Sequence, residues 1–272
     1  FSSQDLTLLR GGPKERRDWL DDVVLKLRPG LYELPGKYEK IVAQRNRLLK
    51  TIFEGSRPPA SYDEELKVWD VQLCRFGARL IKSRVEVLNV LLPQAEENLR
   101  RVSGLREKLT ATYDFREEFQ NGEEGEHLPL QAILNMESED LAKRMYLSLK
   151  ARRAEEIARR QTLTGPHRDD ITFAINDFSA TAFASQGQQR SLVLSLKLAE
   201  LKLVEEALSE PPLLLLDDVL AELDLSRQGM LMDLVKKDMQ TLITTTHLDG
   251  FRPEWLTGAK ITHVAEGALI IK

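Results

Sequence analysis

Residues 185–224 read SQGQQRSLVLSLKLAELKLVEEALSEPPLLLLDDVLAELD and contain two short motifs. The first motif, at residues 185–190, opens a predicted helix, because apolar residues recur after it on one face. Those apolar residues are Leu192, Leu196, Ala199 and Leu203. Ser185 is the expected N-cap, and Gly187 leaves the backbone open at the helix start. The N–H groups of such a helix end, with a small hydroxyl beside them, favour a phosphate oxygen.

The second motif is the apolar run at residues 213–216, which is too short for a helix and is followed by Asp217 and Asp218. This pattern is typical of a buried parallel strand that delivers carboxylates at its carboxyl edge. Ligands of open α/β sheets bind at that edge, where a carboxylate can hold Mg²⁺ beside nucleotide phosphates. The second motif is therefore a candidate magnesium site.

A third motif, LITTTH at residues 242–247, predicts a β-branched strand that ends in His247. We expect this strand to neighbour the strand that ends in the two aspartates. Taken singly, each motif has a plainer explanation: a capped helix, a strand that ends in Asp, or a structural histidine. The presence of all three in one chain favours a functional interpretation.

In chain order, these motifs and residues 222–224 (ELD) resemble the signature motif, Walker B motif, D-loop and switch histidine of ATP-binding-cassette (ABC) ATPases. The similarity is closer still to the RecF family of bacterial DNA repair proteins. It extends over residues 165–170 (GPHRDD) and 244–251 (TTTHLDGF), and more loosely over residues 44–46 (QRN). The resemblance implies an α/β fold, with an ABC-ATPase-like (P-loop NTPase) lobe and an inserted, mostly helical arm.

The resemblance also implies roles at the strand edge. Asp217 would hold Mg²⁺, directly or through water. Asp218 stands where related ATPases have a Glu that orients the attacking water, and Asp is one methylene shorter, so hydrolysis is expected to be slow. Glu222 is a secondary catalytic candidate, and His247 would contact the γ-phosphate of ATP.

The signature residues are expected to act across a dimer. The resemblance implies that Ser185, Gly187, Gln188 and Arg190 contact the ATP held by a second subunit, and that Asp224 belongs to the D-loop. ATP would then join two protomers into a homodimer, and hydrolysis would loosen it.

The implied function is an ATP-dependent DNA-binding clamp of recombinational repair and replication-fork maintenance. It would act at single-strand gaps or at junctions of single- and double-stranded DNA, and promote recombinase loading with RecO- and RecR-type mediators. A part in the SOS response and a cytoplasmic location follow from the same resemblance. Two alternatives stay open: an ABC transporter ATPase subunit, and a structural or interaction fragment that binds no nucleotide.

The chain has no Gly-x-x-x-x-Gly-Lys-Ser/Thr motif. ATPases of this class need that loop, because it cradles the phosphates and supplies a lysine and a magnesium ligand. In the resembling family the loop precedes the region that matches Phe1. We therefore expect the chain to be the C-terminal part of a longer protein, inactive alone, with weak ATPase activity at full length.

Composition limits the remaining possibilities. The 272 residues are 42% hydrophobic and 30% charged, as in globular proteins, and their net charge of −4 restricts any DNA-binding surface to a local patch. The single cysteine, Cys74, excludes an internal disulfide framework. No apolar run reaches the ~20 residues of a membrane helix. Candidate DNA contacts are Arg16, Arg17, Arg152 and Arg153, for which a solvated or ion-paired face is the alternative.

Two regions are predicted, a mostly helical arm at residues 1–163 and part of an ATPase lobe at residues 164–272. The long helix of the arm would begin with a capping box of Ser61 and Glu64, and Pro93 would kink or end it. The expected helices of the arm are 13–27, 34–53, 62–104 and 141–161, and its strand is 108–115. The ATPase part is expected to contain a hairpin at 171–184 around Asn176 and Asp177, a helix at 226–237, a strand at 241–247 and a closing hairpin at 264–271.

Overall fold

The computed structural model describes residues 1–55, 58–104, 106–115, 129–218, 225–234, 239–248, 251–266 and 268–271. The chain forms two compact units. The large unit is Leu6–Glu210, and the small unit combines Phe1–Asp5 with Pro211–Lys272. Among the described residues, none of the helices has the length and apolar character needed to cross a bilayer.

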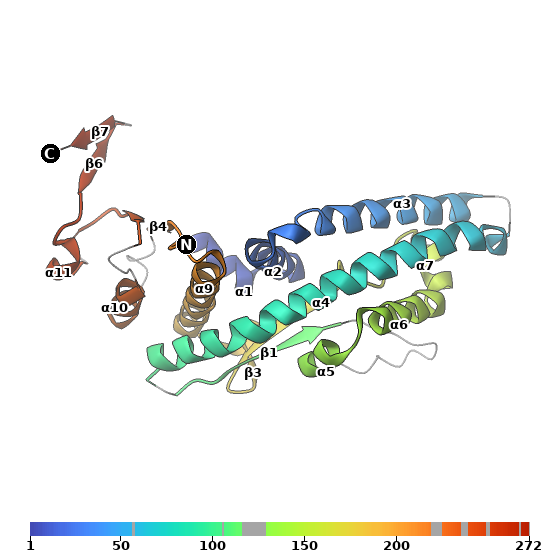
Figure 1. The fold of residues 1–272 in the computed structure, drawn as a ribbon, viewed down its shortest axis with the longest axis horizontal. Coiled ribbons are helices and arrows are strands. Elements are labelled where there is room, and N and C mark those ends of the chain that lie inside the picture. The colour runs from blue at the N-terminus through green and yellow to red at the C-terminus, as the bar shows by residue number, and fades with distance from the viewer. Residues whose placement is uncertain are drawn as a thin grey trace. The chain divides into compact units, whose positions relative to one another are not determined.

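The large unit is built around the 40-residue helix α4 (Asp63–Val102). Helices α3 (Leu34–Glu54) and α6 (Ser138–Ala151) pack along α4, as Figure 1 shows, and α9 (Gln186–Leu208) packs against its C-terminal half. The buried apolar residues of α4 recur at helical spacing, so one face of the helix lies in the core. They include Leu66, Leu73, Ile81, Leu88, Leu91, Ala95 and Leu99.

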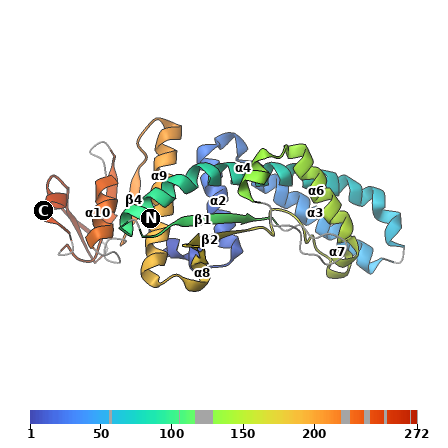
Figure 2. The same ribbon diagram turned by 90° about the horizontal axis from the view of Figure 1, so that it is seen from below.

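A small antiparallel sheet covers another side of the large unit. Strand β1 (Leu109–Asp114) pairs with β2 (Asp170–Ile175) over its whole length, and β2 also pairs with the short strand β3 (Phe178–Ser179). Figure 2 shows β1 and β2 side by side. The remaining helices are α1 (Thr7–Arg10), α2 (Pro13–Leu27), α5 (Leu130–Asn135), α7 (Arg153–Arg159) and α8 (Ala180–Phe183), with 3-10 turns at Ser3–Leu6, Pro29–Leu31 and Pro59–Tyr62.

The predicted helices at 13–27 and 34–53 and the predicted strand at 108–115 are confirmed to within a residue or two at their ends. Pro93, however, does not end the long helix, which continues to Val102. The turns that follow Pro93 are held by α9, because Asn98 donates to the Ser195 carbonyl at 3.2 Å and Lys202 donates to Gln94 at 2.9 Å. Packing against α9 therefore outweighs the backbone hydrogen bond that a proline removes.

The capping box predicted at Ser61 and Glu64 is wrong. A 3-10 turn precedes α4, and within it the Ser61 hydroxyl donates to the Pro58 carbonyl at 2.7 Å. Tyr62 stands at the N-cap position and makes no side-chain hydrogen bond to the helix. The serine hydroxyl belongs to the preceding turn and does not cap α4.

The helix predicted at 141–161 is in fact two helices, α6 and α7, separated at Arg152. This break lets the carboxylate of Glu156, which is fully buried, reach Arg45 on α3. Helix α7 ends at Arg159, and its C-cap residue Arg160 has a left-handed φ of 56°. A tertiary ion pair has overridden a continuous helical pattern.

Of the hairpin predicted at 171–184, the turn is confirmed and the returning strand is shorter than predicted. Asn176 and Asp177 have φ values of 51° and 67°, which a two-residue type I′ turn requires. The returning strand is only Phe178–Ser179, and the residues predicted to form it lie mainly in α8, which packs against β2. Ala180, at the start of α8, is fully buried.

The predicted boundary between residues 163 and 164 does not coincide with the division into compact units. Strand β1 pairs with β2 across it, so residues on both sides share one sheet. The compact units divide instead between Asp5 and Leu6 and between Glu210 and Pro211. The assignment of 1–163 to an arm and 164–272 to an ATPase lobe remains a prediction about function.

One buried ion network joins α3, α4 and α7. The Arg45 guanidinium, which is fully buried, donates to Asp70 at 2.7 Å, to Glu156 at 2.6 Å and to the Thr162 hydroxyl at 3.0 Å. Burial by itself lowers the pKa of Arg45, but the two carboxylates raise it above its ordinary value. Arg153 adds a further ion pair to Asp70. The network fixes three helices at one point.

A second network joins the GPHRDD segment to the sheet and to α2 and α4. Arg84 donates to both oxygens of Asp21, at 2.6 and 2.8 Å, and to the Pro166 carbonyl at 2.8 Å. Tyr113 donates to the buried carboxylate of Asp169 at 2.8 Å. The GPHRDD segment is therefore a structural joint of the large unit.

His167 of the same segment is a neutral hydrogen-bonding residue. Its Nδ1 atom lies 2.8 Å from the Tyr38 hydroxyl, and its Nε2 atom lies 3.2 Å from the Thr162 carbonyl. Burial lowers the pKa of His167 to about 4.

The small unit contains two parallel strands, β4 (Leu214–Asp217) and β5 (Thr241–Thr244), with Asp217 opposite Thr244. Residues at the beginning of the chain join them, because Ser2 forms a parallel bridge to Asp217 and the Asp217 N–H donates to the Phe1 carbonyl at 2.9 Å. The other elements are α10 (Leu225–Leu234), α11 (Pro253–Leu256), β6 (Thr262–Ala265) and β7 (Ala268–Ile271). Strands β6 and β7 confirm the predicted closing hairpin.

Replacing Arg45 by Met is expected to destabilise the large unit by about 3–5 kcal/mol, because Glu156 would remain buried without its cation and Asp70 would keep only Arg153. Denaturant unfolding monitored by circular dichroism measures this loss. Arg47→Met, at an exposed position on the same helix, is the matched control and should have little effect. Equal losses in the two variants would contradict the role of the network.

Acid should destabilise the chain through His167. Its pKa is depressed in the folded state, so the unfolded chain binds the additional proton between pH 6.5 and about 4. The free energy of unfolding should therefore fall by up to about 3 kcal/mol as the pH is lowered through this window. Thermal melts should show a shallower pH dependence for His167→Gln than for the wild type. His263→Gln, at an exposed position, is the control, and a His167→Gln curve parallel to wild type would refute the prediction.

Candidate nucleotide-binding residues

The signature segment begins α9 with the capping box that its sequence predicts. The Gln188 N–H donates to the Ser185 hydroxyl at 3.3 Å, and the Ser185 N–H donates to the Gln188 side chain at 2.9 Å. Ser185 and Gln186 are exposed, while most residues of the helix from Ser191 to Glu200 are buried. An accessible helix N-terminus, with its partial positive charge, is thus mounted on a buried helix.

Neighbouring side chains hold this helix end in place. Gln188 donates to Glu107 at 3.0 Å, and Arg10 donates to Gln189 at 3.0 Å. The Ser191 hydroxyl donates to the Gly187 carbonyl at 2.9 Å, and Arg190 is partly buried beside it. The polar side chains of the first turn are therefore oriented before any ligand binds.

Further along α9, Glu200 anchors the helix to α2. It accepts hydrogen bonds from the Trp19 indole at 3.1 Å and from Lys26 at 2.8 Å. Burial by itself raises the pKa of Glu200, but Lys197, Lys26 and Trp19 together lower it below its ordinary value. Glu200 is therefore an ionised anchor that keeps α9 in position.

The carboxyl edge of the β4–β5 pair carries Asp217 and Asp218, as predicted. The Thr244 hydroxyl donates to the Asp217 carboxylate at 2.6 Å. The Asp218 N–H points to the same residue, 3.2 Å from the Thr244 carbonyl and 3.1 Å from its hydroxyl. Asp218 has a φ of 54°, and both aspartates are exposed. One threonine thus contacts the side chain of Asp217 and the backbone N–H of Asp218.

Sequence reasoning did not single out Thr244. The available signal is its place in the run Thr244–Thr245–Thr246, which directly follows the apolar part of the strand. Only the parallel register, with Asp217 opposite Thr244, shows which of the three hydroxyls reaches the carboxylate.

His247 follows β5 in the loop at the same edge. Its N–H donates to the Thr245 hydroxyl at 3.3 Å, and that hydroxyl donates to the His247 carbonyl at 2.9 Å. The predicted strand 241–247 is thus shorter, ending at Thr244, and a compact turn presents the exposed histidine. Glu222 and Asp224 lie outside the described residues.

The strand edge fits a magnesium ion held mainly by phosphate and water. Mg²⁺ is commonly bound through one or two carboxylates together with substrate phosphates. Asp217 provides such a carboxylate, exposed and fixed by Thr244. Across the part of the chain that the structure describes, no cluster of three or more Asp, Glu, His or Cys side chains forms a self-sufficient metal site.

The arginines considered for DNA binding are engaged within the chain. Arg16 is buried and donates to both oxygens of Asp170, at 2.7 and 2.9 Å, and Arg17 donates to the Asp169 carbonyl at 2.7 Å. Burial lowers the pKa of Arg17 below its ordinary value, although nearby carboxylates oppose that shift. Their contacts favour the ion-paired alternative over a DNA contact.

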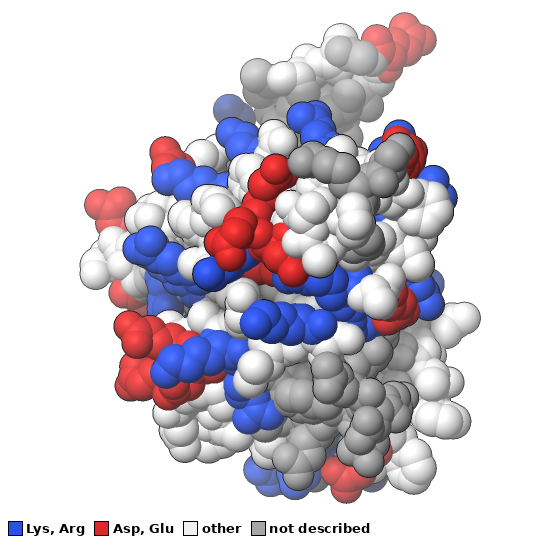
Figure 3. All heavy atoms as spheres, turned by 90° about the vertical axis from the view of Figure 1, so that its right-hand side faces the viewer, with Lys and Arg blue, Asp and Glu red and all other residues white. Residues whose placement is uncertain are grey.

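Arg152 and Arg153 have intramolecular partners as well. Arg152 donates to Glu155 at 3.0 Å, and Arg153 pairs with Asp63 at 3.1 Å and with Asp70. Figure 3 shows Lys and Arg side chains interleaved with Asp and Glu on the end of the molecule where α3 ends and α4 begins. DNA binding by these four arginines remains untested.

Comparison with known proteins connects these features to one family. No protein-family model matches the chain. Three curated relatives are DNA replication and repair proteins RecF, from Synechococcus sp. (strain JA-2-3B'a(2-13)), Thermosynechococcus vestitus and Synechocystis sp. (strain ATCC 27184 / PCC 6803 / Kazusa). They are 44%, 45% and 43% identical to the chain over 99% of its length and 67%, 66% and 67% of theirs. The chain thus spans about two thirds of the length of these relatives.

Two solved structures are similar over the whole fold. The recombination mediator protein RecF-ATPrS in the RecFOR pathway aligns with a TM-score of 0.81 at 29% identity, over 99% of this chain and 66% of that one. RecF-ATP in the same pathway aligns with a TM-score of 0.74 at 31% identity, over 92% and 62%. The predicted fold class is confirmed, an α/β fold of the ABC-ATPase type with a large helical region. The chain therefore belongs to the RecF family of DNA replication and repair proteins.

Proposed function

We propose that this chain provides two nucleotide-contacting elements of an ATP-dependent DNA-binding protein of recombinational repair. The observation that carries the proposal is the strand edge, where Thr244 contacts Asp217 and Asp218 in the register of two parallel strands. The capped, accessible start of α9 is the second element. Membership of the RecF family decides against the transporter alternative.

At the strand edge, each residue would have a separate task. Asp217 would contact Mg²⁺, which when bound neutralises phosphate charge. Asp218 would orient the attacking water, and His247 would contact the γ-phosphate. Because Asp218 has a shorter side chain than Glu, the water would be held less favourably, and turnover would be slow.

The start of α9 would contact the nucleotide of a second protomer. Ser185, Gly187 and Gln188 would surround a phosphate oxygen, with Arg190 one turn further along the helix. Two protomers would then close on ATP as a clamp on gapped or junction DNA, and mediators of the RecO and RecR type would act with it in recombinase loading. DNA would be held mainly through its phosphates, so its binding would weaken with salt.

Sedimentation velocity with and without Mg²⁺ and ATP tests the contact between the start of α9 and the nucleotide of a second protomer. The experiment uses a protein that has the full length of the relatives. ATP should convert monomer to dimer, and Ser185→Arg should abolish this change because the larger cation blocks the helix end. Loss of the Ser185 N-cap should lower the free energy of unfolding by about 1 kcal/mol. Thermal melts show whether the variant is still folded under the conditions of the experiment. Ser61→Arg, at another exposed serine of the large unit, should still dimerise. If the sedimenting mass is the same with and without ATP, the result would favour the alternative, an interaction fragment that binds no nucleotide.

The positioning role of Thr244 is testable in the same protein. Thr244→Val removes the hydroxyl at nearly constant volume, so the Asp217 carboxylate loses its partner, while the Asp218 N–H keeps the Thr244 carbonyl. We expect the rate constant of ATP hydrolysis to fall about tenfold with little change in ATP affinity. Thr241→Val on the same strand, whose hydroxyl contacts only the Met239 carbonyl at 3.4 Å, should retain the wild-type rate. Equal rates in the two variants would show that Thr244 is dispensable.

A further inference from the structure

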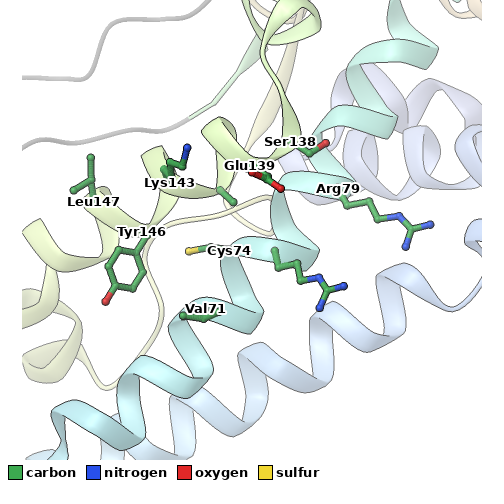
Figure 4. Close-up of a pocket in the computed structure, with 10 residues that line it drawn as sticks. Val71, Cys74, Arg79, Ser138, Glu139, Lys143, Tyr146 and Leu147 are labelled. Carbon is green, nitrogen blue, oxygen red and sulfur yellow. The ribbon is translucent and has the colours of Figure 1, made fainter.

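The large unit contains a groove of about 920 Å³ between α4 and α6, away from the residues discussed above. The two helices run in opposite directions, so each wall is a row of side chains one turn apart. On α4 the wall is Val71, Arg75 and Arg79, and on α6 it is Glu139, Lys143 and Leu147. Cys74, Ala142 and Tyr146 lie between the walls. Figure 4 shows Tyr146 of α6 on the side of that helix where Cys74 and Val71 of α4 lie.

One end of the groove is apolar and open to solvent. Val71 is 54% exposed and Leu147 is 56% exposed, although burying large aliphatic side chains would stabilise the fold. Tyr146 lines the same groove, partly buried, and the Lys150 ammonium stands over its ring at 5.1 Å from the centroid. Exposed aliphatic and aromatic groups gathered in one concave site are typical of a surface that binds another molecule.

The other end of the groove carries cations. Arg75 and Arg79 are exposed one turn apart on α4, and no carboxylate pairs with either of them among the described residues. Arginines elsewhere in this unit, such as Arg16 and Arg45, are held by bidentate or multiple ion pairs. Lys143, on the opposite wall, is paired with Asp140 at 2.8 Å. Within the part of the chain that the structure describes, these two guanidinium groups are open to a carboxylate from a partner.

We propose that this groove binds an acidic amphipathic helix of a partner protein. Val71 and Arg79 are eight residues apart, which corresponds to about 12 Å along α4, or two turns of a bound helix. The partner would place large apolar side chains against Val71, Tyr146 and Leu147. Its carboxylates, one to two turns further on, would pair with Arg75 and Arg79.

The lining favours a peptide over a nucleic acid. Much of it is apolar, and such surface offers nothing to a phosphate backbone. An acidic amphipathic helix matches both the apolar end and the cationic end.

Fluorescence anisotropy with two synthetic helical probes tests this proposal on the intact chain. The acidic probe carries Leu and Phe at positions i and i+4 and Glu at i+7 and i+11, and the basic probe has Lys in place of both Glu residues. The acidic probe should bind saturably and more tightly than the basic one. Arg75→Glu combined with Arg79→Glu should weaken the acidic probe about tenfold or more and strengthen the basic probe.

Val71→Ser separates the apolar contribution, because it removes aliphatic surface without adding a charge, and it should also weaken the acidic probe. Its matched control is Val90→Ser, on the same helix and 47% exposed, which should bind like the wild type. The proposal is overturned by absence of saturable binding, by equal affinity for the two probes, or by an unchanged affinity in the double arginine variant. It is also overturned if a short DNA duplex, and not the acidic probe, depends on Arg75 and Arg79.

Discussion

The buried guanidinium of Arg45 is the interaction on which the large unit most depends. It satisfies Asp70 of α4 and Glu156 of α7 at once, with the Thr162 hydroxyl as a third partner. An unpaired carboxylate in this position would be strongly destabilising, so three helices are forced to meet at the same point. Glu156 reaches Arg45 from α7, just after the break at Arg152 that separates α6 from α7.

Helix α4 connects this network to the signature helix. Its first half packs with α3 and α6, and its second half supports α9 through buried leucines and through Asn98 and Gln94. The exposed start of α9 is thereby fixed by interactions deep in the large unit, including the ionised anchor Glu200. A rigid support of this kind is what a site for a phosphate group requires, since the donors must be oriented before the ligand arrives.

Sequence patterns identified the candidate site better than they identified its surroundings. The capping box of Ser185 and Gln188 and the strand that ends in Asp217 are local patterns, and each depends on only a few neighbouring residues. The partners of the arginines were harder to predict, because the Arg16 guanidinium pairs with Asp170, which is distant in sequence. Arg45 did carry a signal, since it falls on the apolar face of its helix between Ile41 and Leu49. Thr244 required the strand register, which no single-strand pattern provides.

The central claim is that the start of α9 in one protomer and the strand edge of another act on the same ATP. Mixing two defective proteins, at the full length of the relatives, tests it most directly. Ser185→Arg leaves the strand edge intact, and Asp218→Asn leaves the start of α9 intact. The account predicts that each alone is inactive, while their mixture regains ATP hydrolysis, because one site of the mixed dimer combines two intact elements. A mixture no more active than its components would contradict the account.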